Sequence, residues 1–182
     1  AMKYNKVQQE AASEKAIAAL LNESPDGYFD GTRLRARHIL IPVDFYAAPA
    51  EKRKVRQRLQ RIARQIREDP NVTFESAARK YSSCPSSKKG GDLGFFQFPQ
   101  MVPPFSVAAF GLEKGKLSEP VLTKFGYHLI QVTGRDKPQR PIRPDLADQM
   151  ARRYLMSRRH DRMVFETLED HPVRVNPKLQ GE

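Results

Sequence analysis

The chain has 182 residues, 39% of them hydrophobic, which is enough for one well-buried core with helical additions but not for two large domains. Its 32 lysines and arginines outnumber 21 acidic residues, and the net charge of +11 weakly favours acidic partners. A single cysteine excludes an internal disulfide and a multi-cysteine metal site, and no run approaches the roughly 18 apolar residues of a membrane span.

The N-terminus carries no basic region followed by an apolar run. Because the chain begins Ala1-Met2, we expect that a natural leader or anchor was trimmed away. The missing leader therefore does not decide the compartment.

The first half of the chain predicts three helices and one strand. Apolar residues share one side of a helix over 3–22, and residues 34–41 alternate as in a strand with a buried centre. Residues 49–69 carry apolar residues at steps of four, three and four, and 73–82 read as a short helix capped by Thr73. The outer face of the 49–69 helix carries Lys52, Arg53, Lys54, Arg56, Arg58, Arg61, Arg64 and Arg67. We interpret that face as solvated, with nucleic-acid binding as the minor alternative.

The second half predicts three more strands and two helices. Strands are expected over 93–98, within "LSEPVLT" (117–123) and within "GYHLIQVTG" (126–134). A helix begins near Pro103 and Pro104, whose fixed φ suits a first helical turn. The proline-rich "DKPQRPIRP" predicts a linker, followed by a helix through Leu168 and a short extended tail, "HPVRVNP". The order predicts an α+β fold with a small four-stranded sheet covered by helices.

Several consecutive segments resemble the signature blocks of the parvulin peptidyl-prolyl isomerases. They are "ARHILI" (36–41), "FESAARKYSSCPSSKKGGDLGFF" (74–96) and "MVPPFSVAAFGLEKGKLSEPVLTKFGYHLIQV" (101–132). The resemblance implies cis/trans isomerisation of the bond before proline, without a cofactor. It divides the chain into an N-terminal helical extension (1–32), an isomerase domain (33–136) and a C-terminal linker, helix and tail (137–182).

The residues make physical sense of that activity. Rotation must pass a barrier of about 18–20 kcal/mol because the twisted amide loses resonance, yet no covalent bond changes. The site therefore needs an apolar socket, exclusion of water and neutral polar groups matched to the twisted bond. A nucleophile is unnecessary.

By resemblance, an apolar wall binds the proline ring. Leu93, Met101 and Phe105 form the wall, and Phe110 lies close behind it or in the core. Phe125 stands where some relatives carry serine, which makes the rim more apolar. Taken without the family pattern, such residues are more often ordinary core.

His38 and His128 lie in strands that the resemblance places side by side, where the imidazoles can hydrogen-bond. Without cysteine or carboxylate neighbours at metal spacing they make a poor zinc site, so no metal is expected. We interpret them as a polar network under the pocket that orients its neighbours and does not transfer protons. By resemblance, Thr123 places a hydroxyl near them.

Cys84 raises the alternative of a Cys-His protease, but a nucleophile also needs an oxyanion arrangement and a third orienting group. The resemblance instead places the thiol at the pocket edge, where many relatives have a carboxylate. The glycines of "KKGGDLG" lack the Gly-Lys-Ser/Thr of a phosphate-binding loop and precede a strand. They predict a tight turn.

The loop after the first strand, "PVDFYAAPAE", contains acidic residues and no basic one, whereas phosphoserine-directed relatives have a basic cluster there. A preference for phosphorylated substrates is therefore not expected. The flanking helices resemble the split chaperone portions of exported bacterial parvulins, which implies a periplasmic or cell-envelope location and unfolded or proline-containing polypeptides as partners, although the cytoplasm stays open.

Three hypotheses follow: an active isomerase, a holdase-type chaperone with weak isomerase activity, and a nucleic-acid-binding accessory protein. The last ranks lowest, and no nucleic acid is expected, because the chain has no basic-aromatic stacking platform. The oligomeric state is left open.

Overall fold

The structure, a computed structural model, describes residues 14–140 and 142–170, with side chains described up to residue 157. Its elements in chain order are α2 (Glu14–Glu23), β1 (Arg33–Ile41), α3 (Pro49–Glu68), α4 (Phe74–Tyr81), the 3-10 turn η1 (Pro85–Lys89), β2 (Asp92–Gln97), the 3-10 turn η2 (Phe98–Gln100), α5 (Pro103–Phe110), β3 (Val121–Thr123), β4 (Gly126–Asp136) and α6 (Pro144–Asp170).

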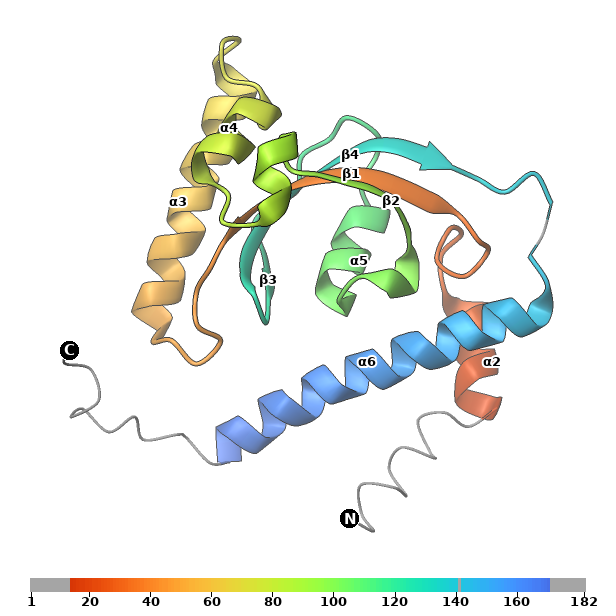
Figure 1. Cartoon of the computed structure of the whole chain (residues 1–182). Coiled ribbons are helices and arrows are strands. Elements are labelled where there is room, and N and C mark those ends of the chain that lie inside the picture. The colour runs from red at the N-terminus through yellow and green to blue at the C-terminus, as the bar shows by residue number, and fades with distance from the viewer. Residues whose placement is uncertain (1–13, 141, 171–182) are drawn as a thin grey trace.

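The four strands form one antiparallel sheet in the order β2-β1-β4-β3, which confirms the predicted α+β fold (Figure 1). The two central strands are the longest, and they pair along the whole of β1 with a register shift between Arg35 and Ala36. They also have the most buried residues, as the sequence predicts for the centre of a covered sheet.

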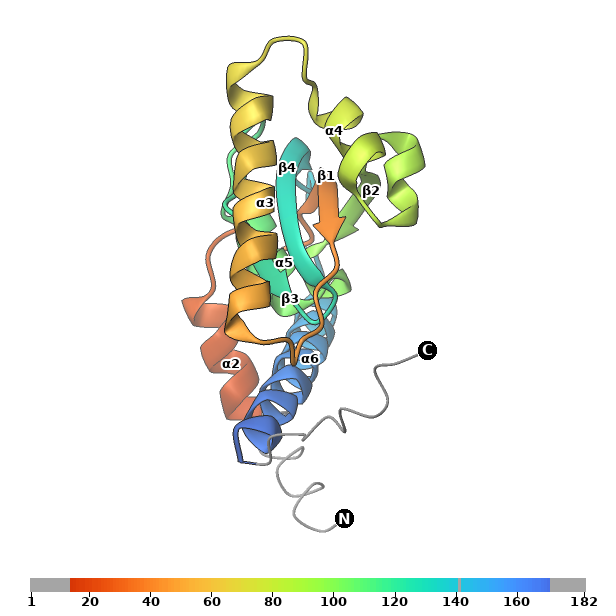
Figure 2. The same ribbon diagram turned by 90° about the vertical axis from the view of Figure 1, so that its left-hand side faces the viewer.

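Helices cover both faces of this sheet. Successive strand residues point to opposite faces. Ile39 and Ile41 of β1 pack in one cluster with α3 and α4, whereas Leu34 and Ala36 pack in a second cluster with α5. Figure 2 shows α3 running alongside β4. The sheet therefore separates α3 from α5.

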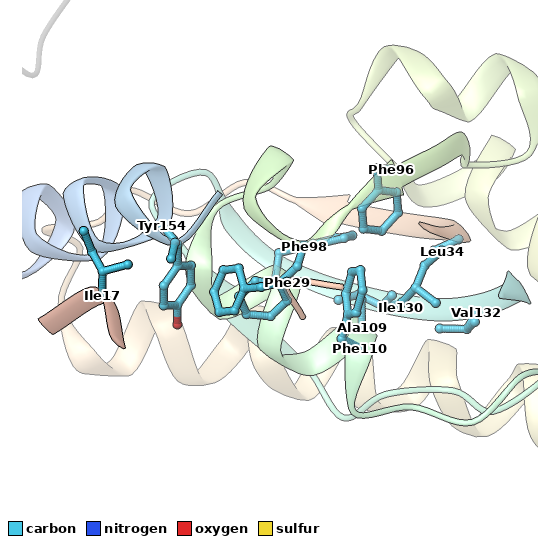
Figure 3. Close-up of a cluster of buried hydrophobic side chains, with 13 residues drawn as sticks. Ile17, Phe29, Leu34, Phe96, Phe98, Ala109, Phe110, Ile130, Val132 and Tyr154 are labelled. Atoms are coloured by element: carbon cyan, nitrogen blue, oxygen red, sulfur yellow. The ribbon is translucent and has the colours of Figure 1, made fainter. Parts of the chain in front are cut away.

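The second cluster extends beyond the sheet to both terminal helices (Figure 3). Ile17 of α2 and Tyr154 of α6 are buried in it, together with Phe29 of the segment before β1. Phe98 lies among them, with its ring stacked on Tyr28 at 3.9 Å. A continuous core thus connects the sheet to α2 and α6.

Most predicted elements are confirmed, and the differences have local causes. Thr73 caps α4 as expected, with its Oγ1 accepting the Ser76 N–H at 3.1 Å. The strand predicted over 117–123 shrinks to β3 because Pro120 has no N–H to donate, and Leu117 makes only an isolated bridge with Gln131. The first 11 residues of the predicted 3–22 helix and the tail at 171–177 lie outside the described residues.

Candidate active site

Two buried histidines meet on the α5 face of the sheet. Leu40 lies opposite His128 and Ile130 lies opposite His38, so the histidines are diagonal neighbours on paired strands. Their Nδ1 atoms are 3.1 Å apart and their rings are stacked with centroids at 5.3 Å. The predicted contact between the two imidazoles is therefore confirmed.

Each imidazole has a hydroxyl at its other nitrogen. Nε2 of His38 lies 3.1 Å from Oγ of Ser86 in η1, and Nε2 of His128 lies 2.8 Å from Oγ1 of Thr123 in β3. Thr123 Oγ1 also accepts the N–H of Phe125 at 3.1 Å. The result is a chain of four side chains, hydroxyl, imidazole, imidazole and hydroxyl.

The contact between the two Nδ1 atoms excludes protonation of both imidazoles at once, and in the neutral pair the tautomers are coupled. One Nδ1 must donate and the other accept, so the single proton between them fixes both tautomers together. Either direction is satisfied, because each hydroxyl can donate or accept. Burial lowers the pKa of His38 to about 4, and burial with the nearby charge of His38 lowers the pKa of His128 to about 3.

The lowered pKa values predict that acid destabilises the fold. Below pH 6.5 each histidine binds a proton in the unfolded chain but not in the folded one, so stability is full above that pH and falls below it. The expected slope is about 1.4 kcal/mol per pH unit for each histidine, so at pH 5 each histidine costs about 2 kcal/mol and the pair about 4 kcal/mol. Urea unfolding between pH 7.5 and pH 5 measures it. The variant H38N should have a smaller slope, and an unchanged slope would show that His38 titrates normally in the fold.

The Phe105 ring of α5 contacts both imidazoles. Pro103 and Pro104 begin α5 as predicted, and the Phe105 ring meets His38 and His128 edge-to-face, with centroids at 5.8 Å and 5.4 Å. Phe105 itself is buried, at 3% exposed.

Leu93 and Met101 are half-buried and pack against the cluster that contains Phe105. The predicted wall residues thus belong to one apolar cluster, and two of them keep part of their surface toward solvent. Phe110 belongs to the deep part of the same cluster, edge-to-face with Phe96 and Phe98.

Cys84 and Phe125 lie in the segments that flank the histidine chain. Cys84 is a partly exposed free thiol that precedes η1, and its N–H donates to Ser82 Oγ at 3.3 Å. Both nitrogens of His38 already have partners, so this imidazole has no free position to deprotonate the thiol. Phe125 is 54% exposed, with the Lys124 ammonium over its ring.

The double glycine holds η1 against β1. Gly90 and Gly91 both have positive φ, at 66° and 84°, a conformation that glycine adopts without strain. A Cβ on Gly91 would lie 2.5 Å from the His38 carbonyl oxygen, and the Gly91 carbonyl accepts the His38 N–H at 2.9 Å. The turn expected from these glycines is confirmed, and it sets the position of Ser86 beside His38.

Ser86 was not among the site residues predicted from the sequence. Serine is common in turns, and nothing in "CPSSKK" distinguishes Ser86 from Ser87. Only the 3-10 geometry of η1, with Pro85 in its first turn, directs one of the two toward the imidazole.

Among the described residues, no three His, Cys, Asp or Glu side chains gather closely enough to hold a metal ion. In the same part of the chain, no helix has the length and hydropathy of a membrane span.

Two bacterial proteins are similar in sequence to most of this chain. The chain is 36% identical over 157 residues to Chaperone SurA of Alkalilimnicola ehrlichii, covering 84% of this chain but 33% of that protein. It is 36% identical over 137 residues to Foldase protein PrsA 1 of Bacillus cereus, covering 75% of this chain and 43% of that protein. The chain thus spans less than half the length of these relatives.

A solved structure is similar along most of the chain. The peptidylprolyl isomerase PrsA from Bacillus anthracis has a TM-score of 0.55 and 25% identity, covering 94% of this chain and 70% of that one. The family described as the PPIC-type PPIASE domain, or rotamase, matches residues 38–134, a segment that begins at His38 and contains the whole histidine chain. Because this match covers more than half of the chain, the protein belongs to the PPIC-type rotamase family.

Proposed function

We propose that the protein is a peptidyl-prolyl cis-trans isomerase that assists the folding of proline-containing polypeptides. The observation that carries the proposal is the pair of buried, neutral imidazoles, held between two hydroxyls and facing the ring of Phe105. Membership of the rotamase family supports the same activity.

The proposed mechanism is non-covalent. The proline ring packs on the wall of Leu93, Met101 and Phe105, which replaces water around the amide with apolar surface. Water stabilises the planar, polar amide, so the exclusion of water lowers the free-energy difference between the planar and the twisted amide. Binding that is tighter to the twisted than to the planar amide accelerates rotation.

The polar chain orients the pocket and takes no proton from the substrate. His38 and His128 stay neutral at pH 7, because burial has lowered their pKa values. Thr123 fixes the His128 ring, and Cys84 serves as a weak polar partner at the edge. Phe110 supports the wall from the core, and Phe125 extends the apolar rim.

Polypeptides in the extracytoplasmic space are the proposed substrates, by similarity to proteins named as chaperones and foldases. Phosphorylated residues before proline are not expected to be favoured. The loop between β1 and α3 contains Asp44 and no lysine or arginine to bind a phosphate.

A panel of short peptides that vary the residue before proline tests the proposal. Exchange NMR or a protease-coupled assay should show faster isomerisation with an apolar residue before proline, at a rate at least tenfold above that of the phosphoserine peptide. Equal isomerisation rates with and without the protein would contradict the proposed isomerase activity. Faster turnover of the phosphoserine peptide would overturn the substrate class.

The variant C84A is the control for a nucleophilic mechanism. It should retain isomerase activity within about tenfold, whereas loss of a nucleophile costs on the order of 10⁴-fold or more.

A holdase-type chaperone with weak isomerase activity is the second candidate. Leu146 and Met156 of α6 are 41% and 49% exposed, which gives this helix apolar surface that an unfolded client can contact.

A further inference from the structure

The outer face of α3 is densely basic. Seven lysine and arginine side chains of this 20-residue helix are exposed: Arg53, Lys54, Arg56, Arg58, Arg61, Arg64 and Arg67. At 1.5 Å per residue the helix is about 30 Å long. We call these seven side chains the α3 basic face.

Few acids neutralise this face. Arg67 pairs with Glu119 at 3.5 Å, and among the described residues this is the single ion pair that the α3 basic face makes. The acids of α3 itself, Glu51 and Glu68, lie at its two ends. Between Arg53 and Arg67 the helix contains no acid, so its positive potential is not cancelled locally.

The apolar side of α3 is already used by the fold. Leu59 and Ile62 are 0% and 4% exposed and pack against β1 and β4. An interfacial helix that inserts into a membrane needs a free apolar face. The α3 basic face therefore can bind a partner by charge alone, without inserting.

The chemistry of the face fits a plane of anionic headgroups better than a single-stranded nucleic acid. Between Arg53 and Arg67 the helix has no aromatic residue on which a base could stack. The exposed aromatic of this region is Tyr46 in the loop before α3, 55% exposed. The loop lies against the helix, because Lys52 contacts the ring of Phe45 at 5.4 Å. Tyrosine is enriched at the headgroup level of membranes.

The α3 basic face and the candidate active site lie on opposite faces of the sheet. Ile39 contacts the α3 cluster, whereas the adjacent residue His38 faces Phe105 of α5. A surface bound at the outer side of α3 would therefore lie across the sheet from Phe105 and the histidines. Binding at one face and isomerisation at the other are compatible.

We propose that the α3 basic face is a docking surface for anionic lipid headgroups, which holds the protein at a membrane surface while the opposite face of the sheet acts on polypeptides. The interaction is electrostatic and peripheral. It rests on the charge and placement of α3 and not on the isomerase activity, so each can be tested without the other.

Vesicle sedimentation tests the proposal directly. The 182-residue chain is mixed with vesicles of phosphatidylcholine alone, or with about 30% phosphatidylglycerol, at low and high salt. Binding is expected only to the anionic vesicles and should fall steeply with salt, because screening shortens the range to about 10 Å at 0.1 M. The variant R53Q/R56Q/R61Q/R64Q should bind them at least tenfold more weakly.

A charge-matched variant distinguishes the α3 basic face from the net charge. K15Q/K114Q/K137Q/R140Q also removes four positive charges, but at exposed positions outside α3. This variant should bind the anionic vesicles nearly as well as the unaltered protein. Equal losses in the two variants would overturn the proposal. So would a lack of binding to anionic vesicles at low salt, or tighter binding to a duplex DNA of about 20 base pairs than to the vesicles. Both variants should keep the isomerase activity of the unaltered protein.

Discussion

Replacing Phe105 by alanine is expected to lower kcat/KM for prolyl isomerisation by at least about a hundredfold, the equivalent of about 2.7 kcal/mol of transition-state stabilisation. The Phe105 ring meets both imidazoles edge-to-face and belongs to the wall proposed to hold the proline ring. Its loss would remove apolar contact with the substrate and admit water to the histidine chain. Exchange NMR on the preferred peptide measures the effect.

Phe105 is also buried, so F105A will lower stability, by about 3–5 kcal/mol if the cavity does not collapse. The variant must therefore be shown to be folded at the assay temperature. M101A is the milder test, because Met101 is half-buried and its truncation leaves a smaller cavity. We expect it to lower kcat/KM by about tenfold.

V107A is the matched control on the same helix. Val107 is 45% exposed on α5, and its truncation should change neither stability nor activity appreciably. Folded F105A and M101A with the activity of V107A would disprove the proposed wall. If these variants lose isomerase activity but still suppress the aggregation of an unfolded client, the holdase function is separate from this site.

Replacing Phe98 by alanine is expected to destabilise the whole described fold by about 3–5 kcal/mol. Phe98 is fully buried. Its ring centroid lies 5.4 Å from that of Phe29, 5.2 Å from that of Phe110 and 4.9 Å from that of Tyr154. These partners come from the segment before β1, from α5 and from α6. The substitution therefore removes packing that joins the terminal helices to the sheet.

Urea unfolding measures the loss, and limited proteolysis shows where the fold opens. Cleavage in α2 and in α6 should become faster than cleavage in the sheet, because these helices are attached to the sheet through the buried cluster that contains Phe98. F95A is the matched control: Phe95 is in β2 and 49% exposed, with Arg33 over its ring, so its loss should cost less than about 1 kcal/mol. Equal stability of F98A and F95A would contradict the role given to this cluster.

The sequence contained enough to predict the elements with strong periodicity or caps. The steps of Val55, Leu59, Ile62 and Ile66 predicted α3, and Thr73 predicted the start of α4. Local signals of this kind act between residues a few positions apart, so they can be read without the fold. The two 3-10 turns were not predicted, and the strand predicted within 117–123 is shorter in the structure, because the limits of these elements depend on contacts with other segments.

The same distinction applies to the candidate active site: most of its residues were selected from the sequence, but their contacts are known only from the structure. The resemblance selected His38, His128 and Thr123, and the structure brings these three into one hydrogen-bonded chain. It also selected Leu93, Met101 and Phe105, which share a cluster. Whether they bind proline is the proposal that the Phe105 and Met101 variants test.

The residue types, their local periodicity and the net charge are properties of the chain alone, and they determined the helices, the strands and the basic outer side of α3. The tertiary structure decided which of these come together. It joined residues 90 positions apart into the His38–His128 contact, selected Ser86 from a run of serines and placed the α3 basic face on the side of the sheet opposite the histidines. The reason is physical: strand register and packing between distant segments are set by the burial of whole faces, which no local pattern specifies.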